Sequence, residues 1–148
     1  MFYNKWDKMK IDPKKINNLT WHLETIREQY IFIRTDIKKL ISANLNNNNI
    51  GIAIKLIELS NQLFDVGLTN YRKILKSMCL NYNSLNKVFY LYIKRARVNV
   101  GLAKNRLMIC YKEQIFNAFI MMLLKKVKRL MILYSELELV YFKIINFE

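Results

Sequence analysis

Apolar residues recur at alternating spacings of three and four over residues 16–40. This heptad pattern predicts an α-helix that keeps one stripe of side chains against a partner helix. Pro13 suits the first turn of such a helix, and Lys38 and Lys39 suit its last turn, where the helix dipole favours cations. We therefore predict a helix at about residues 14–43. Its stripe consists of Ile16, Leu19, Leu23, Ile26, Tyr30, Ile33, Ile37 and Leu40.

Two further apolar registers follow, and we predict that they belong to one long helix at about residues 51–146. The second stripe consists of Leu68, Tyr71, Leu75, Met78, Tyr82, Leu85, Phe89, Tyr92 and Ala96. Leu56, Leu59, Leu63 and Val66 lead into it. A slip of phase near Gly67 indicates a coiled-coil stutter or a helix irregularity. The third register consists of Leu102, Ile109, Phe116, Leu123, Leu130, Leu137 and Ile144. Gly101 lies between the last two registers, where we expect a bend.

The stretch ANLNNNNIGIAI at residues 43–54 is the short polar break between these patterns. Asn ends helices and tolerates left-handed backbone, and Gly51 does so at lower cost. We predict a tip at residues 44–50 that reverses the chain. The predicted fold class is all-α: a single domain over residues 1–148, built as an antiparallel two-helix coiled-coil hairpin. The surplus of the second helix must fold back, find a partner or stand alone.

The chain is strongly basic, with 25 Lys and Arg against 11 Asp and Glu and a net charge of +14. Nucleic acid, anionic lipid or an acidic protein are the partners that such a charge favours. The abundance of Asn, Ile and Lys is typical of an A+T-rich bacterial genome, so part of the basicity follows codon bias. No acidic residue lies between Asp65 and Glu113, and aromatic and basic residues occur together from Phe89 to Arg97, with the aromatic residues at core spacing. The candidate basic face consists of Arg72, Lys73, Lys76, Lys94, Arg95 and Arg97; a solvated helix face is the other interpretation.

Little in the sequence points to catalysis. The single histidine, His22, lies off the first stripe, and three scattered glycines cannot form a phosphate-binding loop. Cys79 and Cys110 have no metal-ligand spacing, and we expect buried free thiols in a reducing cytoplasm. We predict a protein that is not an enzyme and has no catalytic, cofactor or metal site.

The uncharged run at residues 114–124 is shorter than the roughly 20 residues that span a bilayer. We expect it to pack in the core; a partner groove or a membrane surface are the alternatives. Residues 1–15 are charged and do not resemble a secretory signal. The predicted location is therefore cytoplasmic, or peripheral on the inner membrane.

Four features in order resemble the FliJ family of flagellar export proteins, over residues 19–106. They are the stripe Leu19-Leu23-Ile26-Tyr30, the polar tip that ends in Gly51-Ile52, the stretch GLTNYRKIL at 67–75, and Phe89 followed by Arg95. The resemblance implies a hairpin that serves as a non-catalytic component of flagellar protein export. Such a protein couples the export ATPase ring to the export gate and to chaperones. The partner-binding residues that it implies are Leu19, Leu23, Ile26, Tyr30, Leu59, Leu63 and Tyr71.

The chain departs from the family in two respects: its first arm is shorter, and its end beyond Gln114 is more apolar. Both departures affect the open end of the hairpin, where the resemblance implies the contact with the ATPase. Two other functions fit the sequence. A basic helical RNA- or ribosome-binding protein requires the basic residues of 72–106 to form one contiguous stripe. A structural coiled coil would dimerise through the surplus of the second helix.

Overall fold

The structure, a computed structural model, describes residues 11–43, 47–113 and 118–146, and within them the chain is all-helical as predicted. The elements are α2 (Pro13–Ser42), α3 (Asn48–Lys76), α4 (Tyr82–Val88), the π-helix η1 (Phe89–Ile93), α5 (Lys94–Lys112) and α6 (Ala118–Ile145). Because α4, η1 and α5 follow one another without a break, the described residues form four helical arms.

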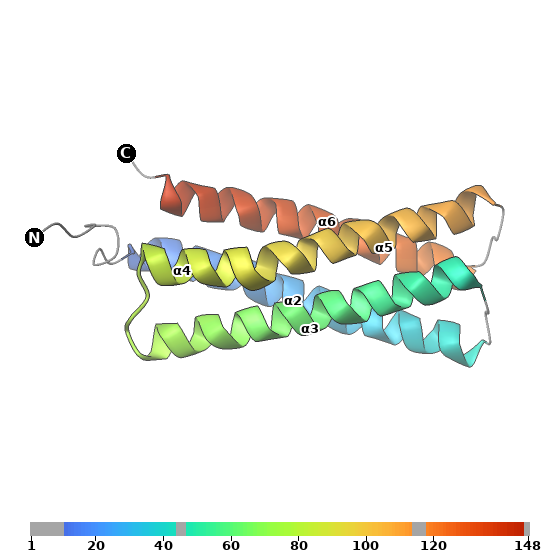
Figure 1. Cartoon of the computed structure of the whole chain (residues 1–148), viewed down its shortest axis with the longest axis horizontal. Helices are drawn as coiled ribbons and strands as arrows, with labels where there is room; N and C mark the ends of the chain where they lie inside the picture. The colour runs from blue at the N-terminus through green and yellow to red at the C-terminus, as the bar shows by residue number, and fades with distance from the viewer. Residues whose placement is uncertain (1–10, 44–46, 114–117, 147–148) are drawn as a thin grey trace, which may run out of the picture.

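The four arms lie side by side and alternate in direction (Figure 1). α3 packs most closely on α5, α2 packs on α6, and α5 also contacts α6. The predicted two-helix hairpin is therefore wrong. Its long helix is interrupted at residues 77–81 and again after Lys112, and the surplus folds back as α6. Gly101 lies inside the continuous helix α5, so the expected bend is not there.

The first predicted helix is confirmed to within one residue at each end, since α2 covers Pro13–Ser42. All eight residues of its stripe are buried, which confirms that the 3-4 spacing identified the core face. The Asp12 side chain caps the helix and accepts a hydrogen bond from the Lys14 N–H at 3.0 Å.

The chain reverses between α2 and α3, as the polar run predicts (Figure 1). Asn47 caps α3, and its side chain accepts hydrogen bonds from the N–H groups of Asn49 and Ile50 at 2.8 and 3.3 Å. Gly51 belongs to the helix itself and has no left-handed backbone. An asparagine cap, and not the glycine, therefore sets the start of α3.

The sequence prediction missed the turn after α3, where Met78 has a φ of 56°. The Cys79 N–H donates to the Ile74 carbonyl at 3.2 Å, and the Met78 N–H donates to the Leu75 carbonyl at 3.3 Å. These two bonds form a Schellman motif, in which glycine normally takes the left-handed position. Leu75 and Met78, assigned to the second stripe, are exposed because the helix ends here.

A capping box restarts the helix at α4. The Ser84 N–H donates to Asn81 Oδ1 at 2.9 Å, and the Asn81 N–H donates to Ser84 Oγ at 3.0 Å. Asn and Ser three residues apart were a readable signal for this helix start. A search for regularly spaced apolar residues does not detect this signal.

The core face of α3 lies one residue away from the predicted lead-in. Its buried residues are Ile50, Ala53, Ile57, Ser60, Phe64, Gly67, Leu68 and Tyr71. Small residues recur every seven positions in this set, at Ala53, Ser60 and Gly67. On α5 the same spacing relates three further small buried residues, which are Ala96, Ala103 and Cys110. The small side chains allow the backbones of α3 and α5 to approach closely.

Two contacts define this close approach. Ser60 Oγ donates a hydrogen bond to the Ala96 carbonyl at 2.8 Å. A Cβ added at Gly67 would lie 2.8 Å from Ile93 Cδ1 and 2.9 Å from Tyr92 Cβ, closer than real side chains pack. Only glycine fits this position without a shift of η1.

The third register is confirmed in α6, where Leu123, Leu130, Leu137 and Ile144 are buried. It fails in α5, where Leu102 and Ile109 are exposed; Phe116 lies outside the described residues. The core of α5 instead continues from Ala96 through Ala103 and Cys110, one residue beyond Leu102 and Ile109. A separate irregularity precedes it in η1. The Lys94 N–H bonds to the Phe89 carbonyl five residues back, so η1 holds one extra residue and the core register moves from Tyr92 to Ile93.

A chain of hydroxyl groups crosses the middle of the bundle. Tyr134 OH lies 2.6 Å from Tyr30 OH, which bonds Ser60 Oγ, and Ser60 in turn donates to the Ala96 carbonyl. The Phe64 ring packs beside both tyrosines, 5.4 Å from Tyr30 and 6.2 Å from Tyr134 between ring centroids. These residues come from α2, α3, α5 and α6, so one buried layer joins all four arms.

We predict that Gly67→Ala destabilises the protein by about 1–3 kcal/mol, because the new methyl group overpacks the contact with η1. Gly101→Ala is the matched control: its Cβ would meet Met131 Cε at an ordinary 3.7 Å. It should stabilise the helix by about 0.5–1 kcal/mol. Urea unfolding followed by circular dichroism measures both. A Gly67→Ala variant as stable as Gly101→Ala would contradict the close approach.

We also predict that Met78→Gly stabilises the protein by about 1 kcal/mol, because glycine has no Cβ to strain the left-handed position. Met78 is largely exposed, so little packing is lost. Ser77→Gly, one residue earlier at a helical φ of −77°, should instead be neutral or destabilising. Thermal unfolding compares the two variants. Equal shifts at both positions would argue against the Schellman turn.

Candidate functional site

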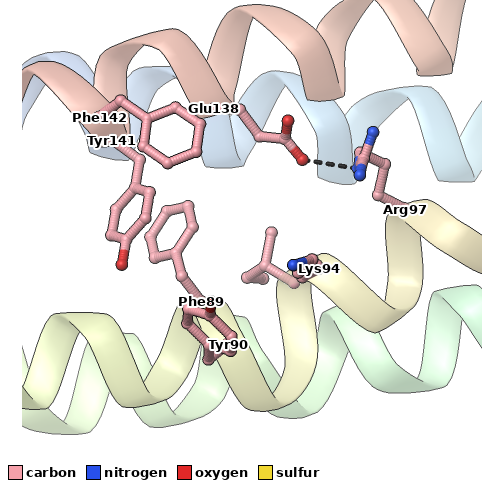
Figure 2. Close-up of a pocket in the computed structure, with 8 residues that line it drawn as sticks. Phe89, Tyr90, Lys94, Arg97, Glu138, Tyr141 and Phe142 are labelled. Atoms are coloured by element: carbon pink, nitrogen blue, oxygen red, sulfur yellow. Dashed lines mark ion pairs between the residues drawn. The ribbon is translucent and has the colours of Figure 1, made fainter.

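A small pocket opens beside the π-turn, in the groove between η1–α5 and α6 (Figure 2). Its volume is about 160 Å³. The residues that line it are Phe89, Tyr90, Ile93, Lys94, Arg97, Glu138, Tyr141 and Phe142. Three of these belong to the five-residue π-helix, a kind of irregularity that is frequent at functional sites.

Two stacked rings form the buried wall of the pocket. The Phe89 and Tyr141 ring centroids lie 4.1 Å apart with an angle of 6° between the ring planes. The Tyr141 hydroxyl donates a hydrogen bond to Asn86 Oδ1. Burial raises the pKa of Tyr141 to about 12, and Tyr90 adds a smaller electrostatic effect in the same direction. This wall is therefore rigid, neutral and apolar.

The rim of the pocket carries charge. Arg97 Nε lies 2.6 Å from Glu138 Oε1, and this ion pair bridges α5 and α6 (Figure 2). Lys94 Nζ lies 5.0 Å from the centroid of the exposed Tyr90 ring, a cation–π contact. Among the described residues, no carboxylate forms an ion pair with Lys94. The pocket thus offers aromatic walls and one cation that a carboxylate does not neutralise.

The size of the pocket limits what it can hold. An apolar cavity of about 150 Å³ is large enough for one benzene ring. One aromatic or branched aliphatic side chain therefore fits between Phe89 and Phe142, and an acidic group beside it would meet Lys94.

The structure buries five of the seven residues that the FliJ resemblance assigns to partner binding. Leu19, Leu23, Ile26 and Tyr30 face the bundle core from α2, and Tyr71 faces it from α3. Of the other two, Leu63 packs partly against the core and Leu59 is exposed. Of the seven, only Leu59 is exposed in the closed bundle, because α6 and α5 cover the faces that a hairpin would leave open.

The six residues of the predicted basic face do not share one side of the molecule. Arg72 is paired with Glu24 of α2, whereas Arg97 is paired with Glu138 of α6. Lys94 and Arg95 are exposed on α5, and Lys73 and Lys76 are exposed at the end of α3. The ion-pair partners of these residues lie on different helices, and the spacing of the basic residues in the sequence does not reveal them.

The other candidate groups have ordinary surroundings. His22 packs edge-on against Trp21, with ring centroids 4.9 Å apart. Cys110 is buried as expected, but Cys79 is exposed, which corrects that prediction. Within the described ranges, no cluster of three or more His, Cys, Asp or Glu side chains could hold a metal ion.

The described part of the uncharged run at 114–124 behaves as a core segment. Ile120, Leu123 and Leu124 are buried in α6, while Phe119 and Met122 are partly exposed. None of the helices in the described ranges has the length and apolarity needed to cross a bilayer. Packing, the default interpretation, accounts for the apolar character of these residues.

Comparisons with known protein families, with curated proteins and with solved structures give no match to this chain. The site must therefore be interpreted from its own geometry. The sequence offered one signal for it, the cluster of aromatic and basic residues from Phe89 to Arg97. It gave no indication that Glu138, Tyr141 and Phe142 of α6 complete the pocket.

We predict that Tyr141→Phe reduces the loss of stability above pH 10. The pKa of Tyr141 is raised to about 12 in the folded protein, compared with about 10 in the unfolded chain. The neutral hydroxyl therefore contributes its full stabilisation of the fold below pH 10, and this contribution is lost as the pH rises toward 12. The variant should lose about 1 kcal/mol less than the parent between pH 9 and pH 11. Urea unfolding at both pH values measures the difference.

Tyr111→Phe serves as the control, because this tyrosine is exposed on the last turn of α5. Its pH dependence should match that of the parent. Identical behaviour of the two variants would mean that the Tyr141 hydroxyl is not buried in the folded protein.

Proposed function

We propose that this chain is a non-catalytic binding protein that holds an acidic segment of a partner protein at the pocket beside η1. One observation carries the proposal: an aromatic pocket of about 160 Å³ has at its rim a lysine that no described carboxylate neutralises. An apolar anchor side chain in a pocket, flanked by charge complementarity, is a common basis of protein recognition.

The charge pattern favours a protein over nucleic acid. RNA binding through base stacking needs accessible rings along a basic groove. Here the rings of Phe89 and Tyr141 stack on each other and are buried, so Tyr90 and Phe142 are the exposed rings of the pocket. Arg72 and Arg97 are held by carboxylates on different helices, which breaks the contiguous basic stripe that the RNA-binding alternative requires.

A narrower form of the proposal is a role in flagellar protein export, with the export ATPase, the export gate and chaperones as partners. It rests on the resemblance to the FliJ family alone. Under it, Leu59 is the one implied contact residue that is exposed, and the buried ones would have to leave the core to reach a partner. Dimerisation through the second helix required the surplus of that helix to expose an apolar stripe. In the structure this surplus is α6, and its apolar stripe packs against α2.

A titration with a short acidic peptide tests the proposal. The probe is an acetylated pentapeptide with one Phe between pairs of Glu, added to ¹⁵N-labelled protein. We expect shifts of the Tyr90, Lys94 and Phe142 amides, and about fivefold weaker binding for Lys94→Glu, the value of one exposed charge contact. Lys128→Glu, the same charge change on the exposed side of α6, should leave the affinity near that of the parent.

Three further probes in the same assay separate the alternatives. Binding of the purified export ATPase or of the gate's cytoplasmic domain would support the narrower role. Binding of poly(U) RNA that falls steeply with salt, without any peptide shifts at the pocket, would overturn the proposal in favour of the RNA-binding alternative. Equal effects of Lys94→Glu and Lys128→Glu on the peptide would show that only net charge matters.

A further inference from the structure

The side of α5 away from the pocket carries a second, larger surface. Four apolar side chains of the η1–α5 helix are exposed there, Leu91, Val98, Leu102 and Ile109, and two of α3 are exposed with them, Leu59 and Val66. We call these six residues the α3/α5 outer face. The four from η1–α5 recur at spacings of seven, four and seven, which keeps them on one side of the helix.

Contacts between the helices place the two sets on the same flank. Arg106 donates a hydrogen bond to Asn49 Oδ1 of α3 at 3.1 Å, so the side of α5 that carries Arg106 faces α3. Leu102 lies one turn before Arg106 and projects from that same side. On α3, Leu59 and Val66 lie four and three residues from Leu63, so the three side chains share one side of the helix, next to the contacts that Ser60 and Gly67 make with the η1–α5 helix.

The close approach of the two backbones makes the face continuous. Ser60 and Gly67 leave no room for large side chains between α3 and the η1–α5 helix, so the apolar residues next to them are displaced outward. Leu56 and Leu63 alternate with Leu59 and Val66 at spacings of three and four, and they are half-buried against the core. A contiguous apolar strip rimmed by polar residues is typical of an interaction site.

The charges around this strip have one sign. Lys55 and Lys73 extend from α3 and Arg95 from α5, all exposed, and Arg106 adds a fourth cation. The two acidic residues of α3, Glu58 and Asp65, each lie one position before a strip residue. They are therefore turned about 100° around the helix.

We propose that the α3/α5 outer face binds an acidic amphipathic helix of a partner protein. Leu91 to Ile109 span about 27 Å at 1.5 Å per residue, the length of a helix of roughly 19 residues. Its apolar side chains would pack into the strip at heptad spacing, and its carboxylates would meet the four cations. A second copy of this chain is a poor occupant, because it would bring cations against cations.

This surface is separate from the pocket beside η1, which lies on the α6 side of α5. The inference therefore does not rest on the function proposed for the pocket. The two differ in their determinants as well: Lys94 and Tyr90 belong to the pocket, whereas Arg95 and Leu102 belong to the outer face.

Fluorescence anisotropy with a labelled synthetic helix tests the inference. The probe is a 21-residue peptide with Leu at heptad core positions and Glu at the flanking ones; a scrambled peptide of the same composition is the reference. We expect Leu102→Glu to weaken binding of the probe at least tenfold. Ile132→Glu is the matched control, since Ile132 is 51% exposed on α6 and Leu102 is 48% exposed on α5. The control should bind within twofold of the parent.

Several outcomes would overturn the inference. They are undetectable binding of the probe, equal affinity for the scrambled peptide, and an equal loss in Leu102→Glu and Ile132→Glu. Sedimentation equilibrium that shows a dimer abolished by Leu102→Glu would assign the face to a second copy instead. Binding to phosphatidylglycerol vesicles that Leu102→Glu abolishes, with no binding of the peptide, would assign it to a membrane surface. Circular dichroism of each variant confirms that the loss is not unfolding.

Discussion

A chain of buried hydroxyl groups sets the register of the whole bundle. Because Ser60 donates to the Ala96 carbonyl, its oxygen must accept the proton of Tyr30. Tyr30 then accepts the proton of Tyr134. Each hydroxyl has one proton to give, so the direction of the whole chain is fixed by the carbonyl at its end. Burial raises the pKa of Tyr30 and of Tyr134, which keeps both rings neutral and able to donate. A shift of any arm by one turn would leave a buried hydroxyl without its partner, at a cost of about 1–3 kcal/mol.

That chain in turn requires α3 and α5 to lie close together. A serine side chain reaches the Ala96 carbonyl only because both residues are small, and the same condition holds at Gly67 against η1. Close packing of these two helices displaces larger apolar residues to their outer flank, where they form the outer face. The π-turn has the complementary effect on the opposite side: its extra residue moves Ile93 into the core and places Tyr90 and Lys94 at the pocket. Both candidate surfaces therefore follow from the geometry of one helix pair.

Sequence patterns predicted those parts of the fold that large apolar residues determine. The stripe of α2 is correct throughout because each of its eight positions holds a large apolar side chain and the neighbouring residues are mostly polar; the buried Asp36 is the core residue of α2 that the stripe omits. On α3 the same reasoning assigned Leu59 and Val66 to the core in place of Ser60 and Gly67. A pattern of apolar residues does not identify core positions that require small side chains. The pocket depended on contacts across 41 positions, from Arg97 to Glu138, that local spacing cannot reveal. The turn at Met78 was not predicted because its left-handed position, which is usually a glycine, is occupied by a methionine.

The placement of the few acidic residues bears on whether the basic charge is functional. Codon bias in an A+T-rich genome can add lysines to exposed positions, but it does not decide where carboxylates go. Three of them pair across helices, Glu24 with Arg72, Asp36 with Lys126 and Glu138 with Arg97. The acidic side chains thus join the arms to one another, and α4, η1 and α5 carry none at all. The charged side chains of the η1–α5 helix are therefore all cations, and one of them, Arg97, is neutralised by Glu138. This is the charge that the acidic partners proposed above would complement.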